Sequence, residues 1–214
     1  MWTRPVLYHC ADARSFRPLW ALEELGMAYD LKLLPFPPRI RAPDFLQENP
    51  LGTIPLLVDG EVRMTESAAI IQYLATRSGP SALSVEPGDP AYGAWLNGLH
   101  FGEATLTFPQ TLVLRYTRLE PEARRNPQVA EDYAKWFMAR LRGLEARLIE
   151  GGGYYCGGRF TGADISVSYA LLLAETLTLS DRFSAAIADY WARMQDRAGF
   201  KAAKRAQASE TAPS

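Results

Sequence analysis

The sequence predicts two domains of different class, an α/β domain with a mixed sheet followed by an all-helical domain. Up to about residue 78, short apolar runs alternate with helical patterns in the order βαβ, a long connection, ββα. Glycine and proline then gather in residues 79–90, and every later segment has helical periodicity. We therefore expect an α/β domain over residues 1–78, a linker over 79–90, a helical domain over 91–205 and a flexible tail over 206–214.

The elements of the α/β domain follow from the period of its apolar residues. Asp59-Gly60 separates two strand patterns, which indicates a hairpin of antiparallel strands, so the sheet has mixed strand direction. Helical patterns are expected at residues 16–25 and 65–75, and strands at residues 6–8, 29–34, 54–58 and 61–64.

The helical domain is predicted from long amphipathic segments and a capping signature. Residues 92–118 and 128–149 each have the pattern of a long helix. Thr161, followed three residues later by Asp164, is typical of an N-terminal capping box, and the apolar run after it predicts the buried central helix. That run covers residues 165–177, and two shorter helices are expected over 183–198 and 199–205.

The composition argues against several classes of partner. The formal net charge of -1 gives no electrostatic reason to expect binding to nucleic acid or to an anionic membrane surface. No apolar run is long enough to span a bilayer, and the first residues lack the pattern of a secretory signal. Cys10 and Cys156 lie far apart and form no metal-ligand cluster with His9 and His100. We expect a cytoplasmic protein that uses no metal and binds neither nucleic acid nor membrane.

The segment between the first strand and the first helix, residues 9–18, suits the binding of an anion. Ser15 as N-cap places Pro18 in the first helical turn, where its missing N–H costs nothing. The hydroxyl of Ser15 is expected to accept from the Arg17 N–H and to donate to a group outside the loop. A thiolate there would meet a helix N-terminus, a hydroxyl and the charge of Arg14, which all lower the pKa of a thiol. The alternative is a plain cap beside a surface arginine.

The segment NPLGTIPLL, residues 49–57, suits an extended peptide ligand. A proline that opens an apolar strand belongs at a strand start or edge, because it cannot donate to the sheet. A cis Ile54–Pro55 bond would turn the backbone of Ile54 outward, so that its N–H and C=O pair with the ligand as an added strand does. A trans proline at the sheet edge is the alternative.

Two further segments suit the charged ends of an amino-acid ligand. Ser67 and the N–H groups at the start of its helix suit a carboxylate, and Glu66 suits an ammonium. The alternative is an ordinary helix cap in which Glu66 stabilises the helix dipole. In the long connection, either Arg39 or Arg41 suits a second carboxylate, unless the two form a solvated basic loop.

In this order and spacing, these segments resemble the glutathione S-transferase family. The matching stretches are LYHCADARSFRPLWALEELG, NPLGTIPLL, DG with MTESAAIIQYL, and FTGADIS in the helical half. The resemblance runs from Val6 to about Phe200 and is nearest to the bacterial and fungal group whose first loop reads like R-S-x-R before the helix. It implies a thioredoxin-like α/β domain followed by an all-α domain, in a cytoplasmic detoxification enzyme.

The resemblance also implies a role for each segment. The Ile54–Pro55 segment, with its cis bond, pairs with the cysteinyl part of glutathione, and Glu66–Ser67 holds the γ-glutamyl end. Either Arg39 or Arg41 faces the glycine carboxylate. Glutathione is the co-substrate, a small hydrophobic electrophile is the second substrate, and the protein is a homodimer.

The first loop departs from the pattern of many relatives. They carry a catalytic serine or cysteine near the loop middle, where this chain has the segment Asp12 to Arg14. An Asp12 carboxylate that points inward would repel a thiolate. The favoured substitute is Ser15, assisted by Arg14 and by backbone N–H groups, and the other is Cys10 at the strand end.

The apolar pocket for the second substrate is expected from the first loop and from the long helix at 92–118. His100 and Glu103 share a helix face, where they form either a polar pair at the pocket mouth or an ordinary hydrogen bond. The candidates on this helix are His100, Glu103, Thr107, Phe108 and Tyr116.

Three functions remain open at this point, with glutathione transfer favoured. In transfer, the protein lowers the thiol pKa and positions an apolar electrophile. In glutathione-dependent peroxide or disulfide reduction, Cys10 must be exposed and have a depressed pKa. A non-catalytic glutathione-binding scaffold is the third, because a fold does not by itself imply an activity.

Overall fold

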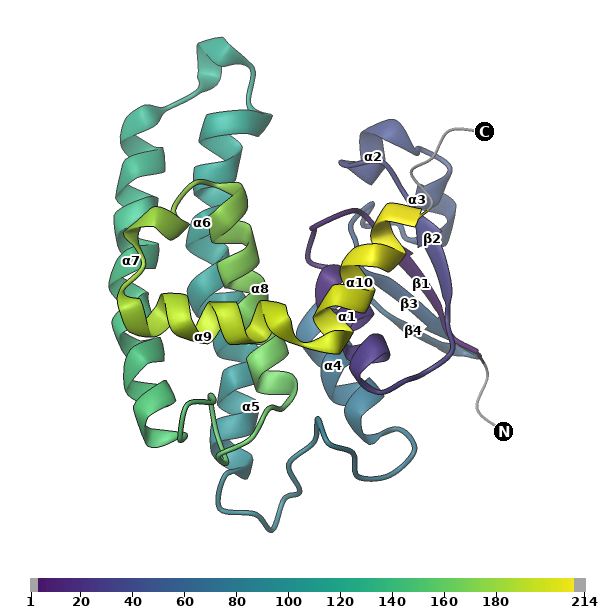
Figure 1. Ribbon diagram of the computed structural model, residues 1–214. Helices are drawn as coiled ribbons and strands as arrows, with labels where there is room; N and C mark the ends of the chain where they lie inside the picture. The colour runs from purple at the N-terminus through teal and green to yellow at the C-terminus, as the bar shows by residue number, and fades with distance from the viewer. Residues whose placement is uncertain (1–3, 210–214) are drawn as a thin grey trace. The chain divides into compact units, whose positions relative to one another are not determined.

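The computed structural model describes residues 4–209, and these form two compact units (Figure 1). One unit contains the chain up to Ser84 together with the chain from Gln195 onward, and the other is Val85–Met194. The division between Ser84 and Val85 falls within the stretch at 79–90 that the sequence predicts as a linker. The C-terminal helix groups with the first unit, whereas the sequence pattern assigns it to the helical domain.

The first unit alternates between strands and helices and is built on a four-stranded mixed sheet in the order β2-β1-β3-β4. Its elements are β1 (Val6–His9), α1 (Phe16–Glu24), β2 (Asp30–Leu33), α2 (Pro38–Arg41), α3 (Phe45–Glu48), β3 (Leu56–Asp59), β4 (Val62–Met64), α4 (Ser67–Thr76) and α10 (Ala198–Ser209). Strand β1 is parallel to β2 and antiparallel to β3, and β3 is antiparallel to β4. The predicted mixed sheet and its hairpin are confirmed.

The core of this unit joins the sheet to α1 and α4. Leu7 of β1, Leu57 of β3, Trp20 of α1 and Ile70 of α4 are fully buried. Full burial of an apolar side chain of this size contributes about 1.5–3 kcal/mol. The core therefore sets where the ends of β1 and β3 lie, and with them the loops that follow and precede these strands.

Helix α10 is held against α1 by an aromatic cluster and an ion pair. The ring of Phe200 lies edge-on at 5.3 Å from the ring of Phe16 and at 5.1 Å from the ring of Trp20. Arg197 donates two hydrogen bonds of 2.8 Å to the carboxylate of Glu24. These contacts explain why the end of the chain belongs to the first unit.

Helix α10, which these contacts hold against α1, extends beyond the predicted helix end at residue 205. Helix α10 runs to Ser209, so residues 206–209 are helical where the sequence predicts a flexible tail. Small residues allow the helix to approach closely, since Ala203 is fully buried and a side-chain carbon at Gly199 would lie 2.6 Å from Glu24. Residues 210–214 of the predicted tail lie outside the described residues.

The second unit is helical throughout most of its length. The predicted long helix at 92–118 is a continuous helical segment that widens twice into π-helix. Pro109 explains the first widening, because its ring would strike the carbonyl one turn earlier in a regular α-helix. The elements are α5 (Tyr92–His100), η1 (Phe101–Thr107), α6 (Phe108–Leu114), η2 (Arg115–Leu119), η3 (Glu122–Arg124), α7 (Pro127–Glu150), α8 (Gly162–Thr176), η4 (Ser180–Arg182) and most of α9 (Ala185–Asp196).

The predicted capping box at the start of α8 is confirmed. The Thr161 hydroxyl accepts from the Ala163 N–H at 3.3 Å, and the Asp164 carboxylate accepts from the Thr161 N–H at 2.9 Å. Asp164 also accepts from the N–H of Tyr155 at 2.8 Å and from the hydroxyl of Tyr190 at 2.9 Å. These bonds satisfy a buried carboxylate, so its role is structural. In the part of the chain that the structure describes, no helix has both the length and the apolar character needed to cross a bilayer.

Candidate functional site

Three segments singled out in the sequence leave the sheet at the same end. Tyr8, near the end of β1, pairs with Leu56, the first residue of β3. Strand β4 ends at Met64, which pairs with Leu57 of β3. Both pairings are antiparallel. The residues that follow β1, precede β3 and follow β4 therefore lie at the same end of the sheet. The segments gathered there are residues 10–15, Ile54–Pro55 and Glu66–Ser67.

A buried arginine joins two of these segments. The side chain of Arg17 is fully buried in α1, and its Nη1 donates to the hydroxyl oxygen of Ser67 at 3.2 Å. A guanidinium is costly to bury, and its burial here beside a ligand-binding candidate makes Arg17 a further candidate for the site. From the sequence, only the backbone N–H of Arg17 was expected to take part in the first loop. The available signal was a charged residue within the apolar stretch from Phe16 to Leu22 of this helix.

The start of α4 presents polar groups toward the same end of the sheet. Glu66 is the N-cap residue, with extended backbone angles and an exposed side chain, and its carboxylate makes no capping hydrogen bond. Ser67, the first helical residue, is buried. A helix N-terminus favours an anion, while the exposed Glu66 carboxylate favours a cation, so the two residues suit a ligand end that carries both charges.

The Ile54–Pro55 bond is cis, the geometry considered from the sequence. The side chain of Ile54 is anchored in an apolar cluster with Cys10, Phe45 and Leu56. Among residues 4–209, neither the N–H nor the C=O of Ile54 takes part in a backbone hydrogen bond outside or inside the sheet. The segment therefore combines a fixed side chain with a backbone that is able to pair with an extended peptide.

The two candidate arginines lie on a short helix that the sequence pattern does not predict, α2 in the long connection. Arg39 lies beside the turn that precedes Ile54, because a side-chain carbon at Gly52 would be only 2.7 Å from the Cβ of Arg39. Arg41 is the last residue of α2, and both side chains are exposed. Arg39 is thus the arginine whose backbone the structure ties to the Ile54 segment.

Ser15 is fully buried within the first loop, so its hydroxyl is not presented to a ligand. The hydroxyl oxygen lies 2.7 Å from Nδ1 of His9 and accepts from the N–H of Cys10 at 3.2 Å. The prediction that it accepts from the Arg17 N–H is wrong, since that N–H donates to the Arg14 carbonyl at 3.2 Å. The physical reason is that Ser15 has helical backbone angles, φ -66° and ψ -10°, whereas a capping side chain needs extended ones.

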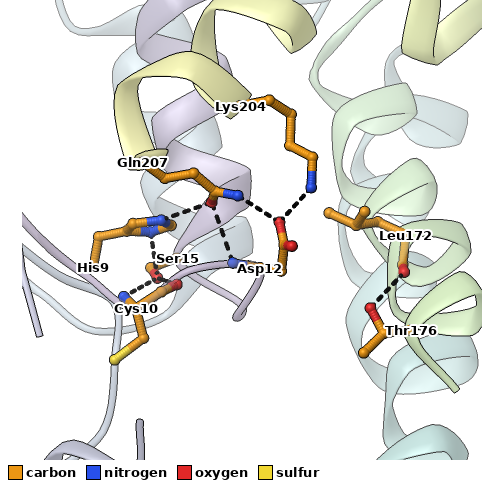
Figure 2. A network of polar contacts seen from close by, with 8 residues as sticks. All are labelled: His9, Cys10, Asp12, Ser15, Leu172, Thr176, Lys204 and Gln207. Carbon is orange, nitrogen blue, oxygen red and sulfur yellow. Dashed lines mark hydrogen bonds and ion pairs between the residues drawn. The ribbon is translucent and has the colours of Figure 1, made fainter. Parts of the chain in front are cut away.

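The carboxylate of Asp12 is held by groups from the C-terminal helix (Figure 2). Its Oδ1 accepts from Lys204 Nζ at 2.7 Å and from Gln207 Nε2 at 2.7 Å. The Asp12 N–H donates to Gln207 Oε1 at 3.2 Å, and the residue has a left-handed φ of 51°. The charge of Asp12 is therefore paired with a lysine, which weakens the repulsion that the sequence analysis expected for a nearby thiolate. Arg14, the next charged residue of the loop, is half-buried.

His9 is a neutral imidazole at the bottom of this network. It is fully buried, and desolvation lowers its pKa to about 4, against smaller opposing contributions from Gln207 and Asp12. Its Nδ1 faces Ser15 and its Nε2 lies 3.0 Å from Gln207 Oε1. Its partner Gln207 is 198 residues away in the chain, too distant to be recognised from spacing.

Cys10 does not have the environment that redox chemistry needs. Its thiol is fully buried in the apolar cluster with Phe45, Ile54 and Leu56. Burial raises the pKa of this thiol to about 12. A reactive cysteine needs exposure and a depressed pKa, and Cys10 has neither.

Three of the residues predicted to line the pocket for the second substrate are polar. His100 is exposed at the end of α5, and Glu103 is half-buried in η1. Thr107 is fully buried, and its hydroxyl donates to the Gly102 carbonyl at 2.7 Å. Its burial and this hydrogen bond within η1 place the Thr107 side chain in the interior of its own unit.

The aromatic candidates of the second unit are more accessible. Phe108 is 47% exposed and lies edge-on to Tyr133 and Trp136 of α7, with ring centres at 6.5 Å and 6.3 Å. Tyr116 is half-buried, with the guanidinium of Arg115 at 5.8 Å from its ring. These two side chains offer apolar surface of the kind that an aromatic ligand contacts.

Two other kinds of site are relevant to the described chain, a metal site and a pocket elsewhere on the first unit. Within residues 4–209, no group of three or more His, Cys, Asp or Glu side chains is placed to hold a metal ion. An open hollow runs along the edge strand β2, lined by Arg4, Val6, Tyr29, Asp30, Leu31, Lys32 and Ala206. It includes the beginning of β1, opposite to the sheet end at which the candidate segments meet.

The segments that meet at this end of the sheet lie in a region that is similar to a known protein family. Residues 6–76 match the family model described as the glutathione S-transferase, N-terminal domain. Over these residues the chain contains a glutathione S-transferase N-terminal domain. The matched range contains the first loop, the Ile54–Pro55 segment and the start of α4, which are the three segments that meet at one end of the sheet.

The chain matches curated glutathione S-transferases and related proteins over part of their length. Glutathione S-transferase 3 of Schizosaccharomyces pombe is 36% identical over 101 residues, which are 47% of this chain and 42% of that protein. For the next two curated relatives, the chain spans 61% and 41% of their length.

Solved structures of the family match over nearly the whole chain. A glutathione transferase from Methylococcus capsulatus is 29% identical with a TM-score of 0.82, covering 95% of this chain and 98% of that one. The glutathione transferase URE2P6 from Phanerochaete chrysosporium, in complex with oxidized glutathione, is 26% identical with a TM-score of 0.82, covering 96% of both chains. The expected fold, a thioredoxin-like domain followed by a helical domain, is confirmed.

Proposed function

We propose that this protein is a glutathione S-transferase that binds glutathione in its first unit and activates the thiol for attack on an apolar electrophile. The observation that carries the proposal is the convergence of the first loop, Ile54 and Glu66–Ser67 at one end of the sheet, with Arg17 joining the last of these to α1. Each segment suits a different part of a γ-glutamyl tripeptide. In this proposal the protein acts in the cytoplasm as a homodimer in detoxification.

The γ-glutamyl end of glutathione binds at the start of α4. Glu66 accepts the α-ammonium, and the N–H groups of the first turn with the hydroxyl of Ser67 donate to the α-carboxylate. Since the oxygen of Ser67 already accepts from Arg17, its own hydrogen remains available to donate. The buried positive charge of Arg17 adds attraction for the carboxylate at short range.

The rest of the tripeptide extends toward Ile54 and the arginines of α2. The backbone N–H and C=O of Ile54 pair with the cysteinyl residue, and this places the thiol beside the first loop. The glycine carboxylate binds Arg39, whose position is tied to the turn before Ile54, with Arg41 as the second cation nearby.

The thiol is activated by the first loop as a whole. The burial of Ser15 and its short contact to His9 argue that Ser15 shapes the loop and does not itself donate to sulfur. The N-terminus of α1, the loop N–H groups and the charge of Arg14 stabilise the thiolate, and the pairing of Asp12 with Lys204 limits repulsion. Glutathione loses its thiol proton to solvent, the thiolate sulfur bonds to the electrophilic carbon, and the leaving group departs with its electron pair.

The helical unit supplies apolar surface for the electrophile. Phe108 and Tyr116 are the candidates with the accessibility that this role needs, whereas Thr107 is enclosed. The redox alternative has no supporting observation, because Cys10 is neither exposed nor acidic.

The proposal is tested by binding and by transfer. At millimolar glutathione the wild-type protein should gain thermal stability, be retained on glutathione-agarose and conjugate a chlorodinitrobenzene-type electrophile. Ser67→Ala and Glu66→Gln should weaken binding by about tenfold or more each, because the first removes a hydrogen bond to the carboxylate and the second removes the charge that pairs with the ammonium, each worth about 1.5–3 kcal/mol. Thr76→Ala is the matched control, since this exposed residue of the same helix only bonds the Gln72 carbonyl. A wild-type protein that shows neither binding nor conjugation rejects the proposal.

A further inference from the structure

Gln207, in the last turn of α10, joins three groups of the first loop. Its Oε1 lies 3.0 Å from His9 Nε2 and accepts from the Asp12 N–H at 3.2 Å, while its Nε2 donates to Asp12 Oδ1 at 2.7 Å. Figure 2 shows this amide between His9 and Asp12. Gln207 is only 7% exposed. A side chain close to the end of the chain therefore completes a polar network that begins in β1.

These contacts determine the direction of the Gln207 amide. The ionised Asp12 carboxylate can only accept and the Asp12 N–H can only donate, so the amide NH₂ must face the carboxylate and the amide oxygen must face the N–H. That oxygen is also the partner of His9 Nε2, which must then carry the ring proton. Gln207 thus holds His9 in the tautomer whose Nδ1 is an acceptor.

The tautomer of His9 in turn orients Ser15. The Ser15 hydroxyl has one hydrogen, and its shorter acceptor is His9 Nδ1 at 2.7 Å, compared with the Cys10 carbonyl at 3.4 Å. With its hydrogen donated to His9, the Ser15 oxygen accepts the Cys10 N–H. The beginning and the end of the first loop are therefore tied together through His9, and His9 is held by Gln207.

Helix α10 is able to hold the loop because it is itself fixed. Phe200 packs between Phe16 and Trp20, and Arg197 pairs with Glu24 at the other end of α1. Near Gln207, one turn earlier on the same side of α10, Lys204 pairs with Asp12 at 2.7 Å. The helix therefore contacts both α1 and the loop that precedes it.

We propose that Gln207 is a positioning residue of the transfer reaction: through His9 and Asp12 it holds the first loop in the shape that activates the glutathione thiol. It touches neither substrate. The inference rests on the proposed function and adds to it that the C-terminal helix, far from the glutathione-binding segments in sequence, sets the activity of the site.

The first test compares Gln207→Leu with Arg205→Ala, an exposed position on the same helix. Gln207→Leu keeps the side-chain bulk and removes every polar contact of the amide. Its kcat/KM should fall on the order of tenfold to a hundredfold, since small displacements of catalytic groups have effects of this size. The loss should appear as a lower kcat. The thiolate absorbance of bound glutathione should reach its midpoint at a higher pH than in the wild type. The KM for glutathione should stay within about twofold, because the groups that bind its two ends are unchanged. Arg205→Ala should match the wild type.

A second readout does not depend on activity. Nitrogen NMR of the two histidines should show His9 in the single Nε2–H tautomer in the wild type and a mixture of tautomers in Gln207→Leu. The exposed His100 serves as the internal reference in both proteins. A protein that merely loses stability would not show a selective change at His9.

A reciprocal exchange tests the direction of the amide. Gln207→Glu alone places two carboxylates face to face, so activity should fall. Adding Asp12→Asn restores one amide and one carboxylate with the donor and acceptor reversed, while the oxygen at position 207 still accepts from His9 and from the position 12 N–H. The double variant should recover at least about half of the lost activity on a logarithmic scale, which a purely additive loss would not allow.

The outcomes separate the two proposals. If wild-type protein neither binds glutathione nor lowers its thiol pKa, the proposed function fails and this inference fails with it, whatever the His9 spectrum shows. If the wild type does both and Gln207→Leu has wild-type kcat and thiolate midpoint, the inference alone is overturned. A wild-type spectrum with His9 in the other tautomer, or no recovery in the double variant, overturns it as well.

Discussion

The hydroxyl oxygen of Ser15 lies 2.7 Å from the imidazole Nδ1 of His9, and both side chains are fully buried. This contact turns the best sequence candidate for a catalytic hydroxyl inward. What remains at the loop surface is backbone, the half-buried Arg14 and an Asp12 whose charge is paired with Lys204. The site therefore relies on the shape of the loop more than on one activating side chain.

His9 makes the stability of the protein depend on pH. Its folded pKa of about 4 is below the ordinary 6.5, so the unfolded state binds a proton more readily. The stabilisation is complete above about pH 6.5 and is lost as the pH falls toward 4, by about 3 kcal/mol in total. Denaturant titrations between these pH values should show a steeper fall for the wild type than for His9→Gln. His100→Gln, at an exposed position, should keep the wild-type slope, and equal slopes in all three proteins would contradict the assignment.

Arg17 should contribute both to stability and to glutathione binding. Arg17→Met keeps much of the buried stem and removes the guanidinium that donates to Ser67. A hydrogen bond to a charged group is worth about 1.5–3 kcal/mol, so the free energy of unfolding should fall by this amount. Glutathione affinity should fall as well, because the charge near the start of α4 is lost. Chemical denaturation and calorimetric titration measure the two effects, and unchanged affinity in a folded variant would remove Arg17 from the site.

Cys10 should be dispensable for transfer. Cys10→Ala removes a buried thiol from the apolar cluster and should cost about 1 kcal/mol of stability with kcat/KM unchanged. In the native wild type, iodoacetamide should modify Cys10 only at the rate of unfolding, because burial raises its pKa to about 12. Ser15→Ala is the informative partner and should lower activity through the loop. Rapid alkylation, or loss of activity in Cys10→Ala, would reopen the redox alternative.

Gly102 should be required for the packing of η1 on α8. A side-chain carbon there would lie 2.4 Å from the backbone of Ser166, a distance at which one backbone must move. Gly102→Ala should therefore destabilise the protein by about 1–3 kcal/mol. Gly93→Ala is the matched control, since nothing lies within 4 Å of the added carbon, and it should stabilise α5 by about 0.5–1 kcal/mol. Thermal unfolding of the two variants measures the expected loss of stability in the first and the expected gain in the second. A Gly102→Ala protein as stable as the wild type would contradict the close packing of η1 on α8.

Local sequence patterns predicted most of the elements because each pattern has a local physical cause. Apolar runs around Asp59-Gly60 predict the hairpin that the structure contains, and Thr161 with Asp164 predicts the capping box. The same reasoning missed α2, because four residues are too few for a periodic signal. It also missed the π-helical turns of η1, although Pro109, whose ring accounts for the widening, is a local signal in the sequence.

Some residues of the candidate site could be predicted from the sequence, and others could not. The segments at Ile54 and at Glu66–Ser67 could be named from the sequence because turn and capping chemistry involve neighbouring residues. The charge of Arg17 beside Ser67 and the pairing of Asp12 could not, since each depends on a partner that is remote in the chain. The burial of Ser15 could not either, because burial depends on how the whole unit packs.

By itself, the sequence determined the fold class, the order of the strands along the chain and the resemblance to glutathione S-transferases, because these follow from periodicity and from motifs that lie within short segments. Only the tertiary structure decided which groups of the first loop face outward. The C-terminal helix, whose small polar residues predict a flexible end, packs on α1 through Phe200 and brings Gln207 to His9. Burial and hydrogen bonding between residues separated by 198 positions are properties of the packed molecule, and no local pattern encodes them.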